Sequence, residues 1–469
     1  MRLMAIGTLT GPKIVRRRQR QNEWAKSLAG DILALFVGLG ICYSIKLIGD
    51  IHINEIILVP SLALLLVVNP SRLRLRKRRI GIILTLMLLW LVGQIVTDIY
   101  RSVEPHDWLR GQANIVIFML DLIAITILLK GNGRRQLIFL YGLAVGLTLS
   151  VRLQPGFIEG GREGAIKFAY SPALFYFVAA ATCFFYQRGR YSIVGLIFFA
   201  DICFNVIFNS RSLTLVIFVA TCLILPVIPE NIGRIRILPP ARSRARVFVI
   251  VGITLIAGTI ASKTMTTLAA SGALGDRAQQ KNQVQTSTGW GILIGGRPEI
   301  LVSSQAVIDS PILGHGSWAK DAKYTRMLAD IESEYGVKVS SAQESRYDYV
   351  IPSHSHIMSA WVEAGILGAV FWIYILVLTV KSILVAARSQ LPLKPAYIPL
   401  LVLFVWDDMF SPFGGMARIT ASFLIVLICD ILDPDSSNQQ SVARTFSHTQ
   451  VPLNRRNLGR IAPHFRSSS

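Results

Sequence analysis

Long apolar runs separated by short basic clusters dominate this sequence and restrict its fold more than any other feature. A helix needs about 17–25 mostly apolar residues to cross the hydrocarbon core of a bilayer. Only 16% of the 469 residues are charged, against about 25% in ordinary soluble domains. The sequence therefore predicts an all-α integral membrane protein with about 12 transmembrane helices. We expect these spans at 27–47, 53–69, 80–99, 113–130, 137–152, 168–186, 191–208, 212–228, 247–263, 356–378, 396–410 and 417–432.

The basic residues indicate which side of the membrane each loop occupies. The formal net charge is +21, and most of the 48 Lys and Arg residues lie in alternate short loops and the two ends of the chain. Because cytoplasmic loops carry an excess of Lys and Arg, we expect both termini in the cytoplasm. The charge does not form the stripe of basic and aromatic residues that binds nucleic acid. We therefore predict membrane lipids, and no nucleic acid, as partners.

The spacing of the apolar runs divides the chain into five segments. Residues 1–26 form a basic cytoplasmic N-terminus, with no signal-peptide cleavage site after it. Residues 27–263 hold predicted transmembrane helices 1–9, and 356–432 hold helices 10–12. Between them, 264–355 form a large polar loop. Because long loops cross the membrane largely regardless of their charge, the flanking spans decide its side, and they place it away from the cytoplasm. Residues 433–469 form a Ser-, Asn- and Gln-rich cytoplasmic tail that we expect to be disordered.

Cysteine and histidine usage argues against a disulfide framework and a metal site. No cysteine lies in the large loop and no CxxC pair occurs. Three histidines, His315, His354 and His356, could in principle hold zinc. However, no HExxH motif occurs, and the carboxylates of the loop lack ligand spacing, so we expect neither metal nor cofactor. The cysteines all lie in apolar runs: Cys42, Cys183, Cys203, Cys222 and Cys429.

Three arginines are candidate binding residues, because a charge at the edge of a span is costly unless it faces a cavity or a partner. Arg211 lies in the turn NSRS, Arg297 follows Gly296 in the large loop, and Arg418 opens the last span. The glycines before Arg297 let the backbone approach a ligand closely. The alternative, that each arginine simply extends to lipid phosphates, stays open.

Two histidines lie where the large loop meets the tenth predicted span, in SHSHIMSAWVEAGILG. Histidine suits proton transfer, because its unperturbed pKa is about 6.5. His354 and His356 are therefore candidates for a general base. The alternative is a polar helix cap at the membrane edge, with Ser353 or Ser355 as the N-cap residue.

Further polar and small residues could support this histidine segment. In a continuous helix Glu363 would lie about 13 Å from His354, so we expect it to hold a neighbouring span. Gly365 and Gly368 would permit close helix packing. Asp407 and Asp408, near the outer end of the eleventh span, could orient His354 if the two spans adjoin.

These motifs resemble the O-antigen ligase and O-antigen polymerase superfamily of bacterial envelope glycosyltransferases, which includes exopolysaccharide polymerases. The family signature is a His, then Asn, Ser or Gln, then nine residues, then Gly-x-x-Gly. Members of the family also carry a Gly-Arg pair upstream, commonly followed by a tryptophan. Here Ile300 and Leu301 stand in place of that tryptophan. The matching residues are Ser210–Arg211, Gly296–Arg297, the turn 311–316 with Gly314 and Gly316, His354–Ser355 and 365–368.

The resemblance implies a GT-C-like membrane enzyme that transfers a glycan from undecaprenyl diphosphate to an acceptor hydroxyl at the periplasmic face of the inner membrane. It implies an inverting, metal-independent reaction. His354 would accept the proton of the acceptor, a glycan or a lipid-linked glycan. Arg211 and Arg297 would bind the donor diphosphate. A polymerase is favoured, with an O-antigen ligase or a protein O-oligosaccharyltransferase as alternatives, and a chain-length regulator and a flippase as partners.

Two hypotheses from other classes stay open at this stage. A polysaccharide transporter or flippase would place ionisable residues within its spans, and Asp121 and Asp201 do lie within predicted spans. Transporters commonly show inverted repeats, and none is visible here. A scaffold of an envelope complex is the third hypothesis, and it would make the arginines and His354 dispensable.

Overall fold

The computed structural model describes most of the predicted spans and part of the large loop. Of the sequence predictions, the basic N-terminus, most of the span 247–263, Gly296, Arg297 and the C-terminal tail lie outside the described residues. The described residues are 27–47, 49–68, 78–129, 131–154, 161–208, 210–225, 298–334 and 349–433, with scattered residues between 231 and 271.

Helices make up nearly all of the described chain. A helix at Ser27–Cys42, which ends in the 3-10 turn η1 (Gly40–Cys42), precedes the antiparallel hairpin β1 (Ser44–Leu47) and β2 (Gly49–His52). The next helices are α2 (Ile53–Val68), α3 (Arg78–Tyr100), α4 (Pro105–Leu129), α5 (Gly133–Leu153), α6 (Gly161–Ala165), the π-helical segment η3 (Ile166–Tyr170), α7 (Ser171–Gln187), α8 (Tyr191–Ile207) and α9 (Arg211–Ile224). A two-residue pairing, β3 (Asn231–Ile232) with β4 (Ile235–Arg236), follows. The later helices are α13 (Glu299–Asp309), α14 (Ala322–Glu334), α16 (His356–Ala364), α17 (Ile366–Arg388), α18 (Lys394–Phe410) and α19 (Gly415–Leu432).

Six helical segments of the described chain are long and apolar enough to cross a membrane. Four further apolar helices are shorter: Ser27–Cys42, Ile53–Leu64, α8 and α9. The protein is thus a mostly helical membrane protein, as its composition predicts. The six segments are α3, α4, α5, Ile166–Gln187, α17 and α19.

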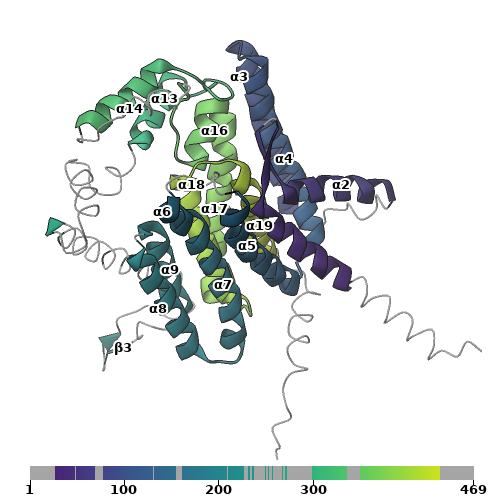
Figure 1. Cartoon of the computed structure of the whole chain (residues 1–469), viewed down its shortest axis with the longest axis vertical. Helices are drawn as coiled ribbons and strands as arrows, with labels where there is room; N and C mark the ends of the chain where they lie inside the picture. Colours follow the sequence, from purple (N-terminus) through teal and green to yellow (C-terminus); the bar gives the residue numbers. More distant parts are fainter. Residues whose placement is uncertain are drawn as a thin grey trace, which may run out of the picture.

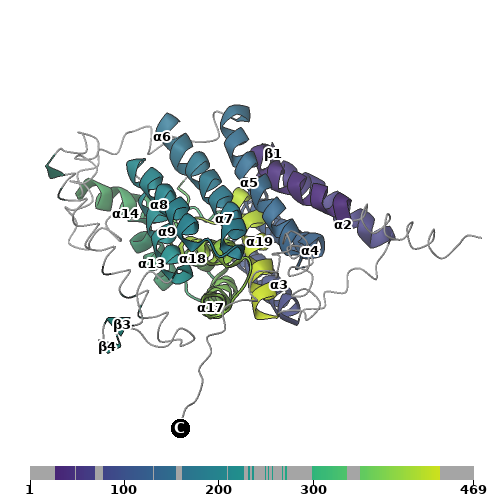
Figure 2. The same cartoon turned by 90° about the horizontal axis from the view of Figure 1, so that it is seen from below.

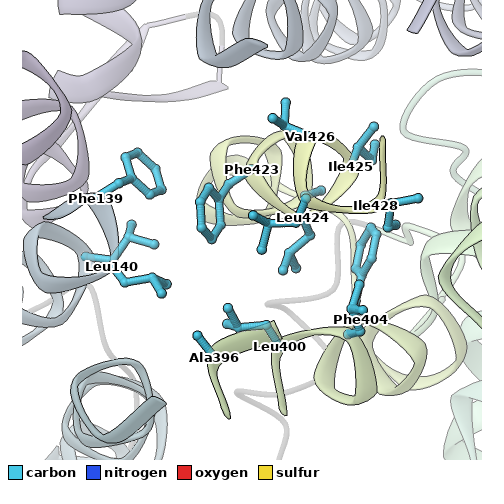
Figure 3. Close-up of a cluster of buried hydrophobic side chains, with 14 of the residues drawn as sticks. Phe139, Leu140, Ala396, Leu400, Phe404, Phe423, Leu424, Ile425, Val426 and Ile428 are labelled. Atoms are coloured by element: carbon cyan, nitrogen blue, oxygen red, sulfur yellow. The ribbon is translucent and has the colours of Figure 1, made fainter. Parts of the chain in front are cut away.

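Helix α19 forms the centre of the bundle. It is the most buried of the six segments, with 67% of its 18 residues buried inside the protein, because it packs against α4, α17 and α18. Figure 3 shows its side chains pointing toward both α5 and α18. On the α5 side, the ring centroids of Phe139 and Phe423 lie 4.7 Å apart. Burying a large apolar side chain stabilises a fold by about 1.5–3 kcal/mol in water, and inside a bilayer close packing takes over that role.

Helices α13 and α14 lie together at one end of the bundle, beside α16 and away from the loop that joins α7 to α8 (Figure 1). Seen from below, α2 projects from the opposite side of the bundle (Figure 2). A small apolar cluster that includes Val302, Tyr324, Leu328 and Ile351 joins α13 and α14 to the segment before α16. Helix α14 lies within the segment that the sequence analysis describes as a large polar loop.

The predicted continuous helix over 356–378 is wrong, because the chain reverses direction at Gly365. His356 and Trp372 would lie about 24 Å apart along one helix, yet their ring centroids are 4.7 Å apart. Helix α16 therefore folds back along the start of α17. Gly365 has φ +64°, and Gly368 lies so close to Ala360 that an added Cβ would be 2.3 Å from the Ala360 carbonyl oxygen. This antiparallel pair is called the α16–α17 hairpin below.

Candidate active site

The residues 310–318, called the glycine turn below, pack against the closed end of the α16–α17 hairpin, where Gly365 joins the two helices. The backbone N–H groups of His315 and Gly316 donate to the carbonyl oxygens of Val362 (2.7 Å) and Glu363 (3.0 Å). In return, the N–H of Ile366 donates to the carbonyl of Ile312 (3.1 Å). The turn and the hairpin thus satisfy each other's backbone groups at the point where α16 ends.

Glycines make this contact possible. Gly314 and Gly316 have φ values of +77° and +93°, a region that residues with a Cβ rarely adopt. A Cβ on Gly365 would lie 2.0 Å from the Ile312 carbonyl oxygen, and one on Gly314 would lie 2.7 Å from the backbone nitrogen of Gly365. The predicted turn is confirmed. The close helix packing predicted at Gly368 occurs against Ala360 of α16.

The C-terminal end of α3 holds the glycine turn in place. Asp98 accepts the backbone N–H of Ser317 (2.7 Å) and its hydroxyl (2.8 Å). The Nε and Nη2 of Arg101 both donate to the Gly314 carbonyl (3.1 and 2.9 Å). Charge-assisted hydrogen bonds of this kind are about twice as strong as neutral ones. The turn therefore has a rigid support.

Ser355 and His356 anchor the start of α16 to the end of α18. The Ser355 hydroxyl accepts the N–H of Met358 (3.2 Å) as an N-cap and donates to the Asp408 carbonyl (2.7 Å). Nδ1 of His356 lies 3.2 Å from Oδ1 of Asp408, and their side chains are only 3% and 0% exposed. Asp408 thus contacts the two residues that follow His354, whereas the prediction paired it with His354 itself.

A cavity opens beside the His356 imidazole, between α5, α7, α18 and α19. Its polar groups include those of His356, Asp407 and Tyr176, and most of its lining residues are apolar. Its volume is about 180 Å³, below the 300–1,000 Å³ of a typical ligand pocket. The cavity can therefore receive one part of a large substrate. The His356 ring also packs among Trp372, Phe404 and Phe413.

His354 has a different environment from His356, although only one residue separates them. Its side chain is 48% exposed, and its Nδ1 lies 3.9 Å from Oε1 of Glu299, the first residue of α13. A half-exposed imidazole can exchange protons with solvent and substrate. The structure therefore separates a buried histidine, fixed by Asp408, from an accessible one.

The three predicted arginines occupy three different situations. Arg211 begins α9 and is half-buried, at the end of the α8–α9 pair. Arg297, with Gly296, lies outside the described residues, two positions before Glu299. Arg418 is buried: its Nε and Nη2 donate to the two carboxylate oxygens of Glu55 (2.7 and 3.0 Å). The guanidinium of Arg418 is thus committed to an internal ion pair and not to lipid phosphate.

Two predicted supporting residues contact other partners than expected. Glu363 lies against the glycine turn: its backbone carbonyl accepts the N–H of Gly316 (3.0 Å), and its carboxyl group lies near the backbone of Trp318. Asp407 lines the cavity and accepts the hydroxyl of Ser411 (2.8 Å). His315 lies apart from His354 and His356, with Nε2 at 2.8 Å from the Ala306 carbonyl. No group of three or more His, Cys, Asp or Glu in the described part of the chain could hold a metal ion.

Sequence reasoning missed the residues that support the site from other helices. Asp98 and Arg101 lie near the end of α3, and Glu55 lies in the first turn of α2. Polar residues at the ends of apolar runs were the available signal, since a charge in such a place needs a partner. The pairing of those partners depends on which helix ends meet.

The fold and the site together define a polytopic helical membrane protein. It has a cavity among its helices, and a histidine segment that runs from this cavity to the smaller helical pair α13–α14. A family model described as O-antigen ligase matches residues 175–373, a range that contains Arg211, Arg297 and His354. The resemblance to the O-antigen ligase and polymerase superfamily is therefore confirmed for this part of the chain. Comparison with curated proteins and with solved structures gave no match.

Proposed function

We propose that this protein transfers undecaprenyl-diphosphate-linked oligosaccharide units to an acceptor hydroxyl at the periplasmic face of the inner membrane, as a polymerase of O-antigen or exopolysaccharide. The reaction inverts the anomeric carbon and needs no metal. Both termini lie in the cytoplasm. The match to the O-antigen ligase family supports the class of reaction.

The observation that carries this proposal is the placement of the His354–His356 segment. His356 lines the cavity and is fixed by Asp408, while His354 stays 48% exposed beside Glu299. A general base must be accessible to the hydroxyl from which it takes a proton and must also be held in position. His354 meets the first condition itself, and the anchored Ser355 and His356 meet the second.

In the proposed reaction the acceptor oxygen attacks the anomeric carbon from the face opposite the diphosphate. Nε2 or Nδ1 of His354 takes the hydroxyl proton as the new glycosidic bond forms. The bond from the anomeric carbon to the phosphate oxygen breaks, and undecaprenyl diphosphate leaves with the electron pair. Arg211 and Arg297 bind the diphosphate and stabilise its growing charge, which bidentate guanidinium contacts do well.

Turnover of a lipid-linked donor by the purified protein in nanodiscs tests the proposal. His354→Ala should lower kcat by about 100- to 10,000-fold, the usual contribution of a general base. His106→Ala is the matched control, because the His106 side chain is 71% exposed and its Nδ1 lies 3.6 Å from Oδ1 of Asp107. It should leave kcat unchanged. Normal turnover by His354→Ala, or an intact donor with the unaltered protein, would overturn the assignment.

The product distinguishes a polymerase from a ligase. Both enzymes release the lipid diphosphate of the donor, but a polymerase adds the glycan to an acceptor that is itself lipid-diphosphate-linked, whereas a ligase moves it to a different carrier. Incubation with a lipid-linked repeat unit alone should therefore give a ladder of lipid-linked products. Products that appear only when a separate acceptor is added would favour the ligase.

A further inference from the structure

A stacked pair, Arg110 of α4 and Trp318 of the glycine turn, lies outside the site described so far. Cζ of Arg110 lies 3.6 Å from the centroid of the Trp318 ring. At this distance the guanidinium interacts closely with the indole face. The glycine turn can approach α4 because position 111 is a glycine: a Cβ there would lie 2.1 Å from the Ser317 hydroxyl oxygen.

The backbone of Trp318 is held in an unusual conformation. Its φ is +50°, and left-handed φ values are genuine outliers for bulky residues, at a cost of about 1–3 kcal/mol. Asp98 holds Ser317 on one side, and the N–H of Ile351 donates to the Ala319 carbonyl (2.8 Å) on the other. These two contacts hold the backbone on either side of Trp318 while its indole stacks on Arg110.

Core packing does not explain why Trp318 is held in this way. The side chain is half-buried and belongs to neither hydrophobic cluster of the described residues. Strained residues persist where the surroundings over-determine them, and they concentrate at ligand-binding sites. A tryptophan outside the core, with a cation on its face, has the composition of a binding platform.

The positive charge of Arg110 has no acidic partner in the described part of the chain. Its Nε is buried without a hydrogen-bond acceptor. Asp107, one turn earlier on α4, is bound to Nζ of Lys320 at 2.6 Å. A half-buried guanidinium that lacks a counter-charge is costly, and an anionic ligand would remove that cost.

The stacked pair lies near the proposed catalytic segment. Ala319, next to Trp318, is hydrogen-bonded to Ile351, and His354 follows Ile351 by three residues. Three extended residues span at most about 10 Å. A glycan at His354 therefore has only a short distance to reach Arg110.

We propose that Arg110 and Trp318 form a binding site for an oxyanion of the glycan donor. The planar fork of arginine binds a carboxylate or a phosphate with two parallel hydrogen bonds, and the indole fixes the plane of that fork. The oxyanion comes either from the donor diphosphate or from an acidic sugar of the repeat unit. This inference rests on the proposed function for the identity of the substrate.

Kinetics with two lipid-linked donors, one carrying a neutral disaccharide and one carrying a disaccharide with a uronic acid, test the site. Arg110→Gln should raise KM by about 10- to 100-fold, the usual worth of a charge-assisted bidentate pair. Arg110→Lys should recover only part of this, because lysine keeps the charge and loses the fork. Trp318→Phe should weaken binding less than Trp318→Leu. Arg326→Gln, at an exposed position on α14, is the matched control and should leave KM unchanged.

The pattern of KM values identifies the source of the oxyanion. An increase for both donors assigns the diphosphate, and an increase for the uronic acid donor alone assigns the sugar carboxylate. If Arg110→Gln leaves both KM values as Arg326→Gln does, the inference is wrong while the proposed function stands.

Direct binding measurements test the oxyanion site independently of the proposed reaction. Inorganic pyrophosphate and glucuronate can be titrated into the full chain in nanodiscs without any turnover. If at least one probe binds the unaltered protein and binds Arg110→Gln about 10-fold or more weakly, the oxyanion site is supported even where no donor is consumed. If neither probe distinguishes the two proteins and KM is also unchanged, the site does not exist.

Discussion

Two arginines with the same chemistry occupy opposite environments in this protein. Arg418 is buried in α19, where its guanidinium donates to both carboxylate oxygens of Glu55, to Asn114 (2.7 Å) and to the Asp50 carbonyl (2.6 Å). Arg110 lies on the face of Trp318, with no carboxylate of the described residues within ion-pair distance. One arginine is fully used by the fold, and the other is left with unused donors.

The difference shows how the two regions divide their roles. The Arg418 cluster joins α19 to α2, α4 and the β1–β2 hairpin, so its loss should lower stability. The glycine turn joins α3, α4 and the α16–α17 hairpin beside the histidine segment, so changes there should reach turnover. Each of the following predictions tests that division.

The largest expected effect on stability comes from Arg418→Met. Removing one member of a buried ion pair leaves an uncompensated charge, at a cost of about 3–5 kcal/mol. The free energy of unfolding in mixed detergent micelles measures it. The double variant Glu55→Leu with Arg418→Met should recover most of the loss, because an apolar pair removes both charges. A loss below about 1 kcal/mol in the single variant would contradict a structural role for this pair.

Gly365→Ala should have the next largest effect. A left-handed residue with a Cβ costs about 1–2 kcal/mol, and the clash with the Ile312 carbonyl adds about 1–3 kcal/mol. We expect a total of about 2–5 kcal/mol and a displaced α16, hence lower kcat. Gly81→Ala in α3 is the control, since a Cβ there meets nothing within 4 Å, and it should be neutral or slightly stabilising. Equal behaviour of the two variants would show that the reversal at Gly365 needs no glycine.

Asp98→Asn tests whether the glycine turn affects turnover beyond stability. The substitution weakens the two bonds to Ser317, at about 1–3 kcal/mol, and should also raise KM for the lipid-linked donor. Asp31→Asn is matched in burial and loses bonds to Arg134 and Arg135 at the far end of the bundle. It should lower stability to a similar degree without changing KM. A parallel rise of KM in both variants would remove the distinction between the two regions.

The smallest expected effect is an acid-dependent loosening of α14 that depends on Asp309. Hydrogen bonds from Lys323, Tyr324 and Gln305 hold the pKa of Asp309 well below its usual range. A carboxyl group with a lowered folded pKa stabilises the fold above its unfolded pKa, about 3.9, and that contribution is lost as pH falls below this value. Hydrogen exchange of α14, corrected for intrinsic rates, should therefore accelerate between about pH 4 and pH 2. Asp309→Asn should abolish the extra acceleration, and an unchanged profile would refute this assignment.

The sequence by itself determined the class of the protein and its local chemistry. Apolar runs of span length and a low charged fraction led to a helical membrane protein, because hydrophobic length is a property of the chain alone. The spacing of His354, Ser355 and Gly365–Gly368 led to the family that the match over 175–373 confirms. Gly314 and Gly316 were recognised as a turn for the same local reason: their backbone freedom is encoded at the residue.

Only the tertiary structure decided which partners these residues meet. The reversal at Gly365 could not be read from an apolar pattern that suits one continuous helix equally well. The commitment of Arg418 to Glu55 depends on contacts between residues more than 350 positions apart. The stacking of Arg110 on Trp318 likewise depends on how the glycine turn meets α4. Pairing is a property of helix packing, and packing is set by the whole bundle and not by any single segment.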